Sequence, residues 1–199
     1  MSLKKVQIVE AVDGLQPQFM KLPTRLKYQR EGEDARFWEM SNGHDTVHVL
    51  VNKVDSGEIL LVKQIRPPVL HKHPDTQGIV FEACAGLIDK YEEYAQVPIR
   101  RARMVASEEV HEEVGYKVRF QDLVGLPTYM SNVGMSGGTC YPFYCEVTDA
   151  DFIGQKLEPS EDIEVFHLKY NLVKAFLEQT TNTDATTRNL LQWFLISKG

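Results

Sequence analysis

The ten residues 107–116 read Ser-Glu-Glu-Val-His-Glu-Glu-Val-Gly-Tyr, and they carry the acidic side chains from which a chemical function can be inferred. Apolar side chains recur at three- and four-residue steps over residues 97–114, which predicts one amphipathic helix. Gly115 ends that helix in the way that a glycine after the last helical turn commonly does. The glutamates of the stretch therefore lie on the last two turns of a predicted helix.

Three of these glutamates, Glu109, Glu112 and Glu113, point the same way, because helical residues three and four apart are neighbours. Like charges at this spacing repel by roughly 0.2–0.5 kcal/mol per pair, so the array does not stabilise an isolated helix. A hard cation that takes oxygen ligands removes the repulsion; Mg²⁺ is the expected ion and Mn²⁺ the alternative. Such an ion can bind a diphosphate and activate water. A solvated acidic helix face is the alternative interpretation.

The composition bounds the possible functions. The chain has 199 residues, of which 43% are hydrophobic and 25% charged, as expected for one globular domain. Its apolar runs are far shorter than the ~20 residues of a membrane span, and no signal segment follows the first five residues. The net charge of −6 disfavours a nucleic-acid partner. Buried, reduced thiols in a cytoplasmic protein are expected for Cys84, Cys140 and Cys145.

The remaining chain predicts more strands than helices. Residues 45–52 and 58–64 are expected to pair as a hairpin, because Asp-Ser-Gly at 55–57 is a turn signal. The absence of a regular strand–helix alternation predicts an α+β fold with helices packed on a mixed sheet. Further strands are expected at 79–84, 117–126, 139–147 and 163–168, and further helices at 172–179 and 184–197.

Residues 1–42 are expected to form a small N-terminal β subdomain, and residues 43–199 the main domain. Short extended pieces are predicted at 6–9, 25–29 and 36–40, separated by prolines and by a turn.

The segment from Gly86 to Tyr116 resembles the signature of the Nudix hydrolases, Gly-x5-Glu-x7-Arg-Glu-U-x-Glu-Glu-x-Gly-U, where U is a bulky aliphatic residue. The flanks resemble the branch of the UDP-sugar and ADP-ribose pyrophosphatases, and the likeness covers about residues 44–170. It implies a Nudix α/β/α sandwich. The residues that match the signature are Gly86, Glu109, Val110, Glu112, Glu113 and Gly115, and the similar flanks are 44–50, 61–67, 82–89 and 146–150.

The resemblance implies Mg²⁺-dependent hydrolysis of the pyrophosphate bond of a nucleoside diphosphate sugar, with UDP-glucose and ADP-ribose as the leading substrates. It also implies a homodimer in which the N-terminal subdomain contributes to the interface and the pocket. A binding module that has lost turnover and a hydrolase of dinucleoside polyphosphates are the alternatives. The implied metal ligands are Glu109, Glu112, Glu113 and the carbonyl of Ala85, with Glu112 also catalytic.

Four residues outside the helix are expected at the site. Arg66 ends a strand and can hold phosphate by two parallel hydrogen bonds, with a surface ion pair as the alternative. Glu82 occupies the slot that the family uses for a substrate or metal contact, with an ordinary strand glutamate as the alternative. Tyr129 is suited to stacking on a base, with Tyr141 as the alternative. Glu161 aligns with the family's general base on an acidic loop, with Glu158 or a helix glutamate as the alternative.

The signature departs from the family pattern at two points. Glu108 lies 22 positions after Gly86, whereas the pattern allows 14, and Glu108 stands where the pattern has arginine. We expect the family's Glu–Arg pair to survive with reversed charges, as Arg100 and Glu108. The alternative assigns the glutamate of that pair to Glu92 or Glu93 and leaves Glu108 without that partner.

Overall fold

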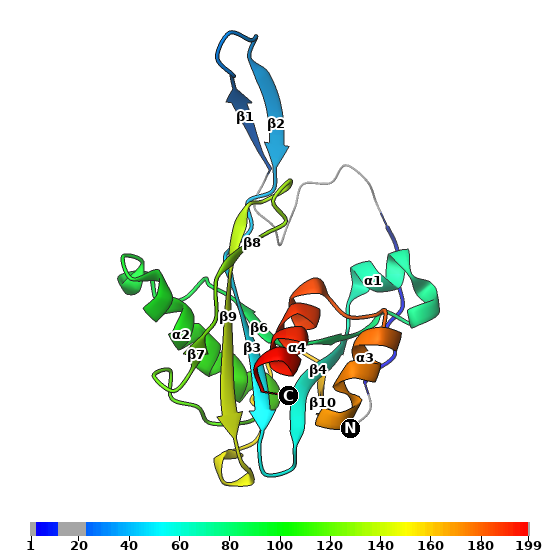
Figure 1. Ribbon diagram of the computed structural model, residues 1–199. Helices are drawn as coiled ribbons and strands as arrows, with labels where there is room; N and C mark the ends of the chain where they lie inside the picture. The colour runs from blue at the N-terminus through cyan, green and yellow to red at the C-terminus, as the bar shows by residue number, and fades with distance from the viewer. Residues whose placement is uncertain (1–2, 12–22, 199) are drawn as a thin grey trace.

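The computed structural model describes residues 3–11 and 23–198, and an eight-stranded mixed sheet forms its centre (Figure 1). The strands are β3 Thr46–Lys53, β4 Glu58–Ile65, β5 Ile79–Glu82, β6 Cys84–Leu87, β7 Val124–Gly125, β8 Tyr129–Ser131, β9 Gly138–Val147 and β10 Ile163–Lys169. Their order is β10-β4-β3-β9-β7, with β5 paired to β4, β6 to β3 and β8 to β9. The predicted hairpin of β3 and β4 is confirmed.

Helices cover both faces of this sheet. The α-helices of the described residues are α1 Pro67–Lys72, α2 Pro98–Glu109, α3 Val173–Gln179 and α4 Ala185–Ser197. Helix α2 continues into one π-helical turn, η3 Val110–Val114, and short 3₁₀ turns lie at η1 Pro74–Thr76, η2 Glu92–Tyr94, η4 Asp149–Asp151 and η5 Tyr170–Leu172. Helix α1 was not predicted, because six residues are too few to give a periodic signal. In the described part of the chain, no helix combines the length and apolar character that crossing a membrane requires.

Strand β3 separates two hydrophobic layers because its side chains alternate between the faces of the sheet. Val47, Val49 and Val51 are fully buried in the layer that includes Val105 of α2. Leu50 is buried on the opposite face, in the layer formed with α3 and α4 (Figure 1). The α+β class with helices on a mixed sheet is therefore confirmed.

The sheet branches at β3, and this branching opens the space for a site. Residues 51–53 of β3 pair with β4, whereas residues 46–49 pair with β6. Strand β4 continues past the branch point and pairs there with β5. The chain crosses from β5 to β6 at the fully buried Ala83, whose N–H donates to the hydroxyl of Thr187 in α4. The ends of β4 and β6 thus diverge instead of pairing with each other.

The strand predicted for residues 117–126 is confirmed only near its C-terminal end, as β7 Val124–Gly125. Only Val124 and Gly125 pair with β9, and the preceding residues form a turn in which Arg119 donates to Asp122. The guanidinium of Arg103, in α2, donates to the carbonyls of Phe120 and Leu123. These backbone groups are satisfied by a side chain from another element, which a local sequence pattern cannot reveal.

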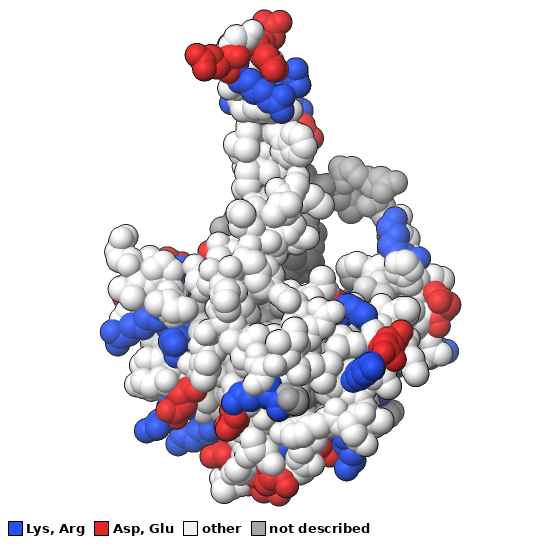
Figure 2. Space-filling model, viewed as in Figure 1, with Lys and Arg blue, Asp and Glu red and all other residues white. Residues whose placement is uncertain are grey.

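The N-terminal region contains a separate hairpin that projects from the body (Figures 1 and 2). Strands β1 Thr24–Tyr28 and β2 Arg36–Met40 lie where two of the extended pieces are predicted, and they pair antiparallel with Phe37 and Trp38 exposed on them. The extended piece predicted at 6–9 is not a strand. Instead, residues 3–11 run along the body, where the N–H of Lys4 donates to Asp162 at 2.6 Å. The rest of the expected subdomain, residues 12–22, lies outside the described residues.

Candidate active site

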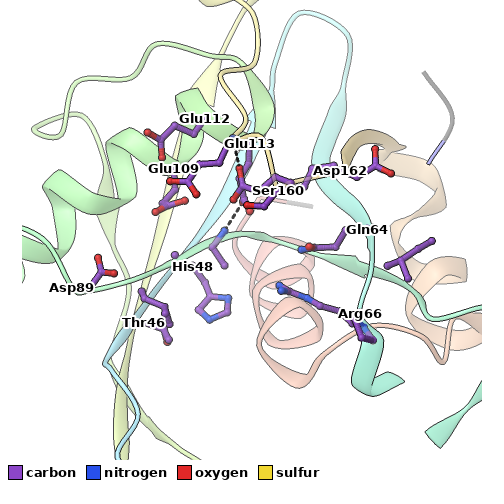
Figure 3. A pocket seen from close by; sticks show the side chains of 18 of the residues that line it. Thr46, His48, Gln64, Arg66, Asp89, Glu109, Glu112, Glu113, Ser160 and Asp162 are labelled. Atoms are coloured by element: carbon purple, nitrogen blue, oxygen red, sulfur yellow. Dashed lines mark hydrogen bonds between the residues drawn. The ribbon is translucent and has the colours of Figure 1, made fainter. Parts of the chain in front are cut away.

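A cavity of about 780 Å³ lies where the sheet branches. Strands β3, β4 and β6 form its floor, the end of α2 with η3 forms one side, and the loop over residues 158–162 forms another. In Figure 3, Glu109, Glu112 and Glu113 lie on one side of this cavity, and Gln64 and Arg66 lie across from them. The acidic helix of the sequence thus faces an open pocket and not bulk solvent alone.

The π-helical turn η3 brings the glutamates to the cavity. Its apolar residues Val110 and Val114 are fully buried against the sheet, so the polar face of the turn is directed to the cavity. Gly115 ends the turn with a φ of 85°, and a Cβ there would lie 2.9 Å from the backbone of Gly154. Both the left-handed backbone and this close approach require glycine.

Two of the glutamates are held by strand β6. The N–H of Ala85 donates to the carboxylate of Glu113 at 2.9 Å (Figure 3). Glu109 reaches over Gly86 so closely that a Cβ on this glycine would lie 2.2 Å from its Oε1 atom. The strand therefore fixes one carboxylate by a hydrogen bond and leaves room for the other by having no side chain.

Burial, with repulsion from neighbouring carboxylates, raises the pKa of Glu109 and of Glu113. Burial raises the pKa of Glu109 to about 8, and the neighbouring Glu113 and Glu112 add to the shift. Burial also raises the pKa of Glu113 to about 7, although the N–H of Ala85 opposes the shift. The charge of Lys90 lowers the pKa of Glu109. A cation among these groups would stabilise their charged forms.

The donors fit a hard divalent cation in their chemistry, since they are carboxylate oxygens that line one cavity. As the side chains lie, no group of three or more acidic, histidine or cysteine residues in the described parts of the chain is arranged to hold a metal ion.

The acidic loop brings Glu161 to the same cavity, together with Glu158. The Oε2 atom of Glu161 accepts from the N–H of Glu158 at 2.8 Å, so one carboxylate oxygen stabilises the turn. The charge of Glu161 also contributes to the raised pKa values of Glu109 and Glu113. Glu161 therefore lies within electrostatic reach of the helix glutamates, although it is distant in sequence.

Arg66 lies at the cavity, at the end of β4, but its partner Glu82 does not line the cavity. The Nε atom of Arg66 donates to Glu82 at 3.0 Å, and the side chain of Gln64 donates to the same oxygen at 2.9 Å. Glu82 therefore holds both Arg66 and Gln64 at the cavity edge, and its expected contact with a ligand stays a prediction. The ion pair considered for Arg66 is present, and the Arg66 side chain is also 47% exposed beside the cavity.

Tyr129 is not among the cavity-lining residues either. It pairs in register with Cys140 of β9, and its hydroxyl is buried. Burial, together with the Cys140 thiol, raises the pKa of this hydroxyl. The expected stacking of Tyr129 on a base therefore has no geometric support, because strand pairing turns the side chain into the protein.

The expected pair of Arg100 and Glu108 does not form. Arg100 lies over the ring of Tyr94, with its guanidinium carbon 4.4 Å from the ring centroid. Glu108 accepts a hydrogen bond from the hydroxyl of Tyr91 and lies 3.6 Å from the ammonium of Lys90. Two helical turns separate Arg100 from Glu108, and each residue has a partner closer to hand.

The alternative assignment, in which Glu92 belongs to the family's pair, finds a partner in Arg101. Their side chains lie 2.6 Å apart, and Arg101 also donates to the backbone carbonyl of Lys90 at 2.6 Å. This contact joins the extended loop to α2. Arg101 is the residue next to Arg100, the arginine that the sequence analysis expected to form the pair.

Several cavity residues were not found from the sequence, among them His48 and Lys90. His48 lies on β3, burial lowers its pKa, and its Nδ1 atom is buried without a hydrogen-bond partner in the described structure (Figure 3). Its place in an alternating strand gave no sign of a pocket. Lys90 lies in the extended loop, whose course cannot be derived from a local pattern.

The relatives found by comparison with known proteins are named as pyrophosphatases of nucleotide sugars or of ADP-ribose. No family model matches the chain. It is 31% identical over 183 residues to the uridine diphosphate glucose pyrophosphatase NUDT14 of Mus musculus, covering 78% of this chain and 79% of the mouse protein. It is also 31% identical over 184 residues to the ADP-ribose pyrophosphatase of Saccharomyces cerevisiae, covering 85% and 72% of the two chains.

A solved structure described as an ADP compounds hydrolase has the same fold. It superposes with a TM-score of 0.66 at 16% identity, and the match covers 100% of this chain and 98% of the other. At this identity the likeness concerns the arrangement of the elements alone. The predicted α/β/α sandwich agrees with it.

Proposed function

Because this chain belongs to the Nudix hydrolases, in the branch of the UDP-glucose and ADP-ribose pyrophosphatases, we propose that it hydrolyses nucleoside diphosphate sugars. The products are a nucleoside monophosphate and a sugar phosphate. One observation carries the proposal: a single cavity has three glutamates on one side and Arg66 on the other (Figure 3).

This arrangement suits a diphosphate. The exposed guanidinium of Arg66 can donate two hydrogen bonds to one phosphate group. The carboxylates repel a bare diphosphate and bind it only through a cation. One side of the cavity therefore requires a metal-bound phosphate, whereas the other binds phosphate directly. A volume of about 780 Å³ is within the range of small-molecule sites.

A divalent cation, Mg²⁺ first and Mn²⁺ as the alternative, is the proposed cofactor. Glu109, Glu112, Glu113 and the carbonyl of Ala85 would hold it at the cavity wall. When bound, such an ion offsets the charge that develops on the phosphate oxygens and lowers the pKa of water. The raised pKa values of Glu109 and Glu113 support this assignment, because a cation would stabilise the charged carboxylates that burial disfavours.

The remaining chemical task is to take a proton from the attacking water. We assign it to Glu161, with Glu112 as the second candidate, since both line the cavity. One oxygen of Glu161 is held by the N–H of Glu158, which fixes the orientation of the carboxylate. Arg66 binds and orients the phosphate on the opposite side, and Glu82 holds Arg66 in place.

The test is ³¹P NMR of the protein with Mg²⁺ and a panel of UDP-glucose, ADP-ribose and a diadenosine polyphosphate. We expect UDP-glucose or ADP-ribose to be converted, because these are the substrates in the names of the relatives. Glu112→Gln should abolish the conversion, and Glu178→Gln on α3 should not. Binding without turnover would overturn the proposal in favour of a binding module, and conversion of the polyphosphate alone would do so in favour of that substrate class.

We further propose a cytoplasmic homodimer in which the N-terminal β subdomain contributes to the interface. The hairpin of β1 and β2 supports this assembly, since an isolated two-stranded hairpin is marginally stable in water and this one exposes Phe37 and Trp38. The free, buried Cys84, Cys140 and Cys145 support a reducing compartment.

A further inference from the structure

The glutamate cluster lacks a cation of its own. Four glutamates lie between Glu108 and Glu113, and residues 104–116 contain no lysine or arginine. The C-terminal end of a helix adds partial negative charge from its unpaired carbonyls. An acidic cluster at this end of a helix is therefore destabilised twice, by mutual repulsion and by the helix itself.

The arginines earlier in α2 are engaged elsewhere. Arg100 lies over the ring of Tyr94, and Arg101 pairs with Glu92 at 2.6 Å. Arg103 donates to the backbone carbonyls of Phe120 and Leu123, in the turn that precedes β7. The nearby helix thus offers no guanidinium to Glu108.

The loop between β6 and α2 provides the missing charge. The ammonium of Lys90 lies 3.6 Å from Glu108 and 3.8 Å from Glu112, so it bridges two carboxylates one helical turn apart. Lys90 is half-exposed and lines the cavity. Its charge lies between Glu108, which stands where the family pattern has arginine, and Glu112, one of the expected metal ligands.

The backbone of the loop is fixed on both sides of Lys90. The carbonyl of Lys90 accepts from Arg101, and the next residue, Tyr91, donates its hydroxyl to Glu108. Tyr91 has a φ of 61°, a left-handed conformation that is rare for a residue with a side chain and that needs such contacts to hold it. These contacts hold the loop backbone at Lys90, and so they hold its ammonium near Glu108 and Glu112.

We propose that Lys90 is a positioning residue that offsets the charge of Glu108 and so keeps Glu112 in place for the reaction. This inference rests on the proposed function for its catalytic consequence. The electrostatic coupling between Lys90 and Glu108 can be measured independently of any activity. Lys90 acts through Glu108 and Glu112, and it makes no essential contact with the phosphates.

The experiment is a double-mutant cycle of Lys90→Met and Glu108→Gln. Lys90→Met should lower the unfolding temperature in EDTA by roughly 2–4 °C and lower kcat by ~10-fold with little change in KM. Adding Glu108→Gln should restore both, because the charge that needed an offset is gone, and Lys90→Arg should retain both. The matched control is the same cycle on Lys63→Met and Glu164→Gln, an ion pair at 2.8 Å whose residues do not line this cavity. These substitutions should change the unfolding temperature and leave kcat unchanged.

A rise in KM that Glu108→Gln does not rescue would overturn the inference, because Lys90 would then bind substrate directly. Additive effects on the unfolding temperature would overturn it as well. If the wild-type protein hydrolyses none of the nucleotide sugars, the proposed function fails, whereas the stability cycle still decides whether Lys90 and Glu108 are coupled.

Discussion

The carboxylate of Glu109 lies directly over Gly86, with its Oε1 atom 2.2 Å from the place where a Cβ on that glycine would be. Gly86 is in strand β6 and Glu109 is in helix α2, so this contact joins the two parts of the signature in space. The glycine is needed for the position of a side chain. No positive φ is involved.

Gly86→Ala should therefore separate activity from stability. The added methyl group displaces the end of a flexible side chain, so we expect the unfolding temperature to change by less than ~3 °C. The displaced carboxylate should lower kcat/KM by ~10–100-fold. Steady-state kinetics and thermal unfolding of the same sample provide the measurement. Gly134→Ala, where nothing lies within 4 Å of the new Cβ, is the control. Full activity in Gly86→Ala would contradict the role given to Glu109.

The raised pKa values of Glu109 and Glu113 predict that stability falls with rising pH. Their ordinary value is 4.5, whereas the folded values are about 8 and about 7, so the folded state retains protons that the unfolded chain has released. The resulting stabilisation is complete below about pH 4.5 and is lost as the pH rises through these values. In EDTA, the unfolding temperature should drop by several degrees from pH 6 to pH 9.

Glu109→Gln should flatten this pH profile, because the amide cannot ionise, and Glu178→Gln should leave it unchanged. Added Mg²⁺ should raise the wild-type unfolding temperature most at pH 9, where the carboxylates are charged. An unfolding temperature that stays constant from pH 6 to pH 9 would be inconsistent with the burial of these groups.

Arg66 is expected to act in binding. Arg66→Lys should raise KM for the nucleotide sugar by ~10-fold with a smaller effect on kcat, because an ammonium cannot donate two parallel hydrogen bonds. Stability should change little, since the ion pair with Glu82 is 47% exposed on the arginine side. Arg119→Lys, in an exposed turn, is the control. An unchanged KM would show that Arg66 serves only its ion pair.

The projecting hairpin leads to a prediction about assembly. Phe37→Ser should convert the proposed dimer to the mass of one chain, because the side chain is 62% exposed and its apolar area is available to a second copy. Light scattering after size-exclusion chromatography measures the mass. Val9→Ser, another apolar-to-polar change at a 92% exposed position, should leave the dimer intact. A monomeric wild-type protein would disprove the proposed assembly.

The sequence alone was sufficient wherever structure depends on neighbours along the chain. The periodicity of residues 97–114 predicted α2 and its continuation, and Gly115 ends the turn as expected. The turn residues at 55–57 predicted the hairpin of β3 and β4. The three glutamates share one face because of helical geometry, so this part of the site was predictable from spacing.

Only the tertiary structure decided which distant residues complete the site. Residues that are far apart in sequence meet through packing, and no local pattern encodes their pairing. Tyr129 is turned into the protein by its register with Cys140, and Glu108 finds its partners in a loop and not on its own helix. Side-chain contacts across elements are selected by the whole fold, because each buried or charged group must find a partner where the packed chain places it.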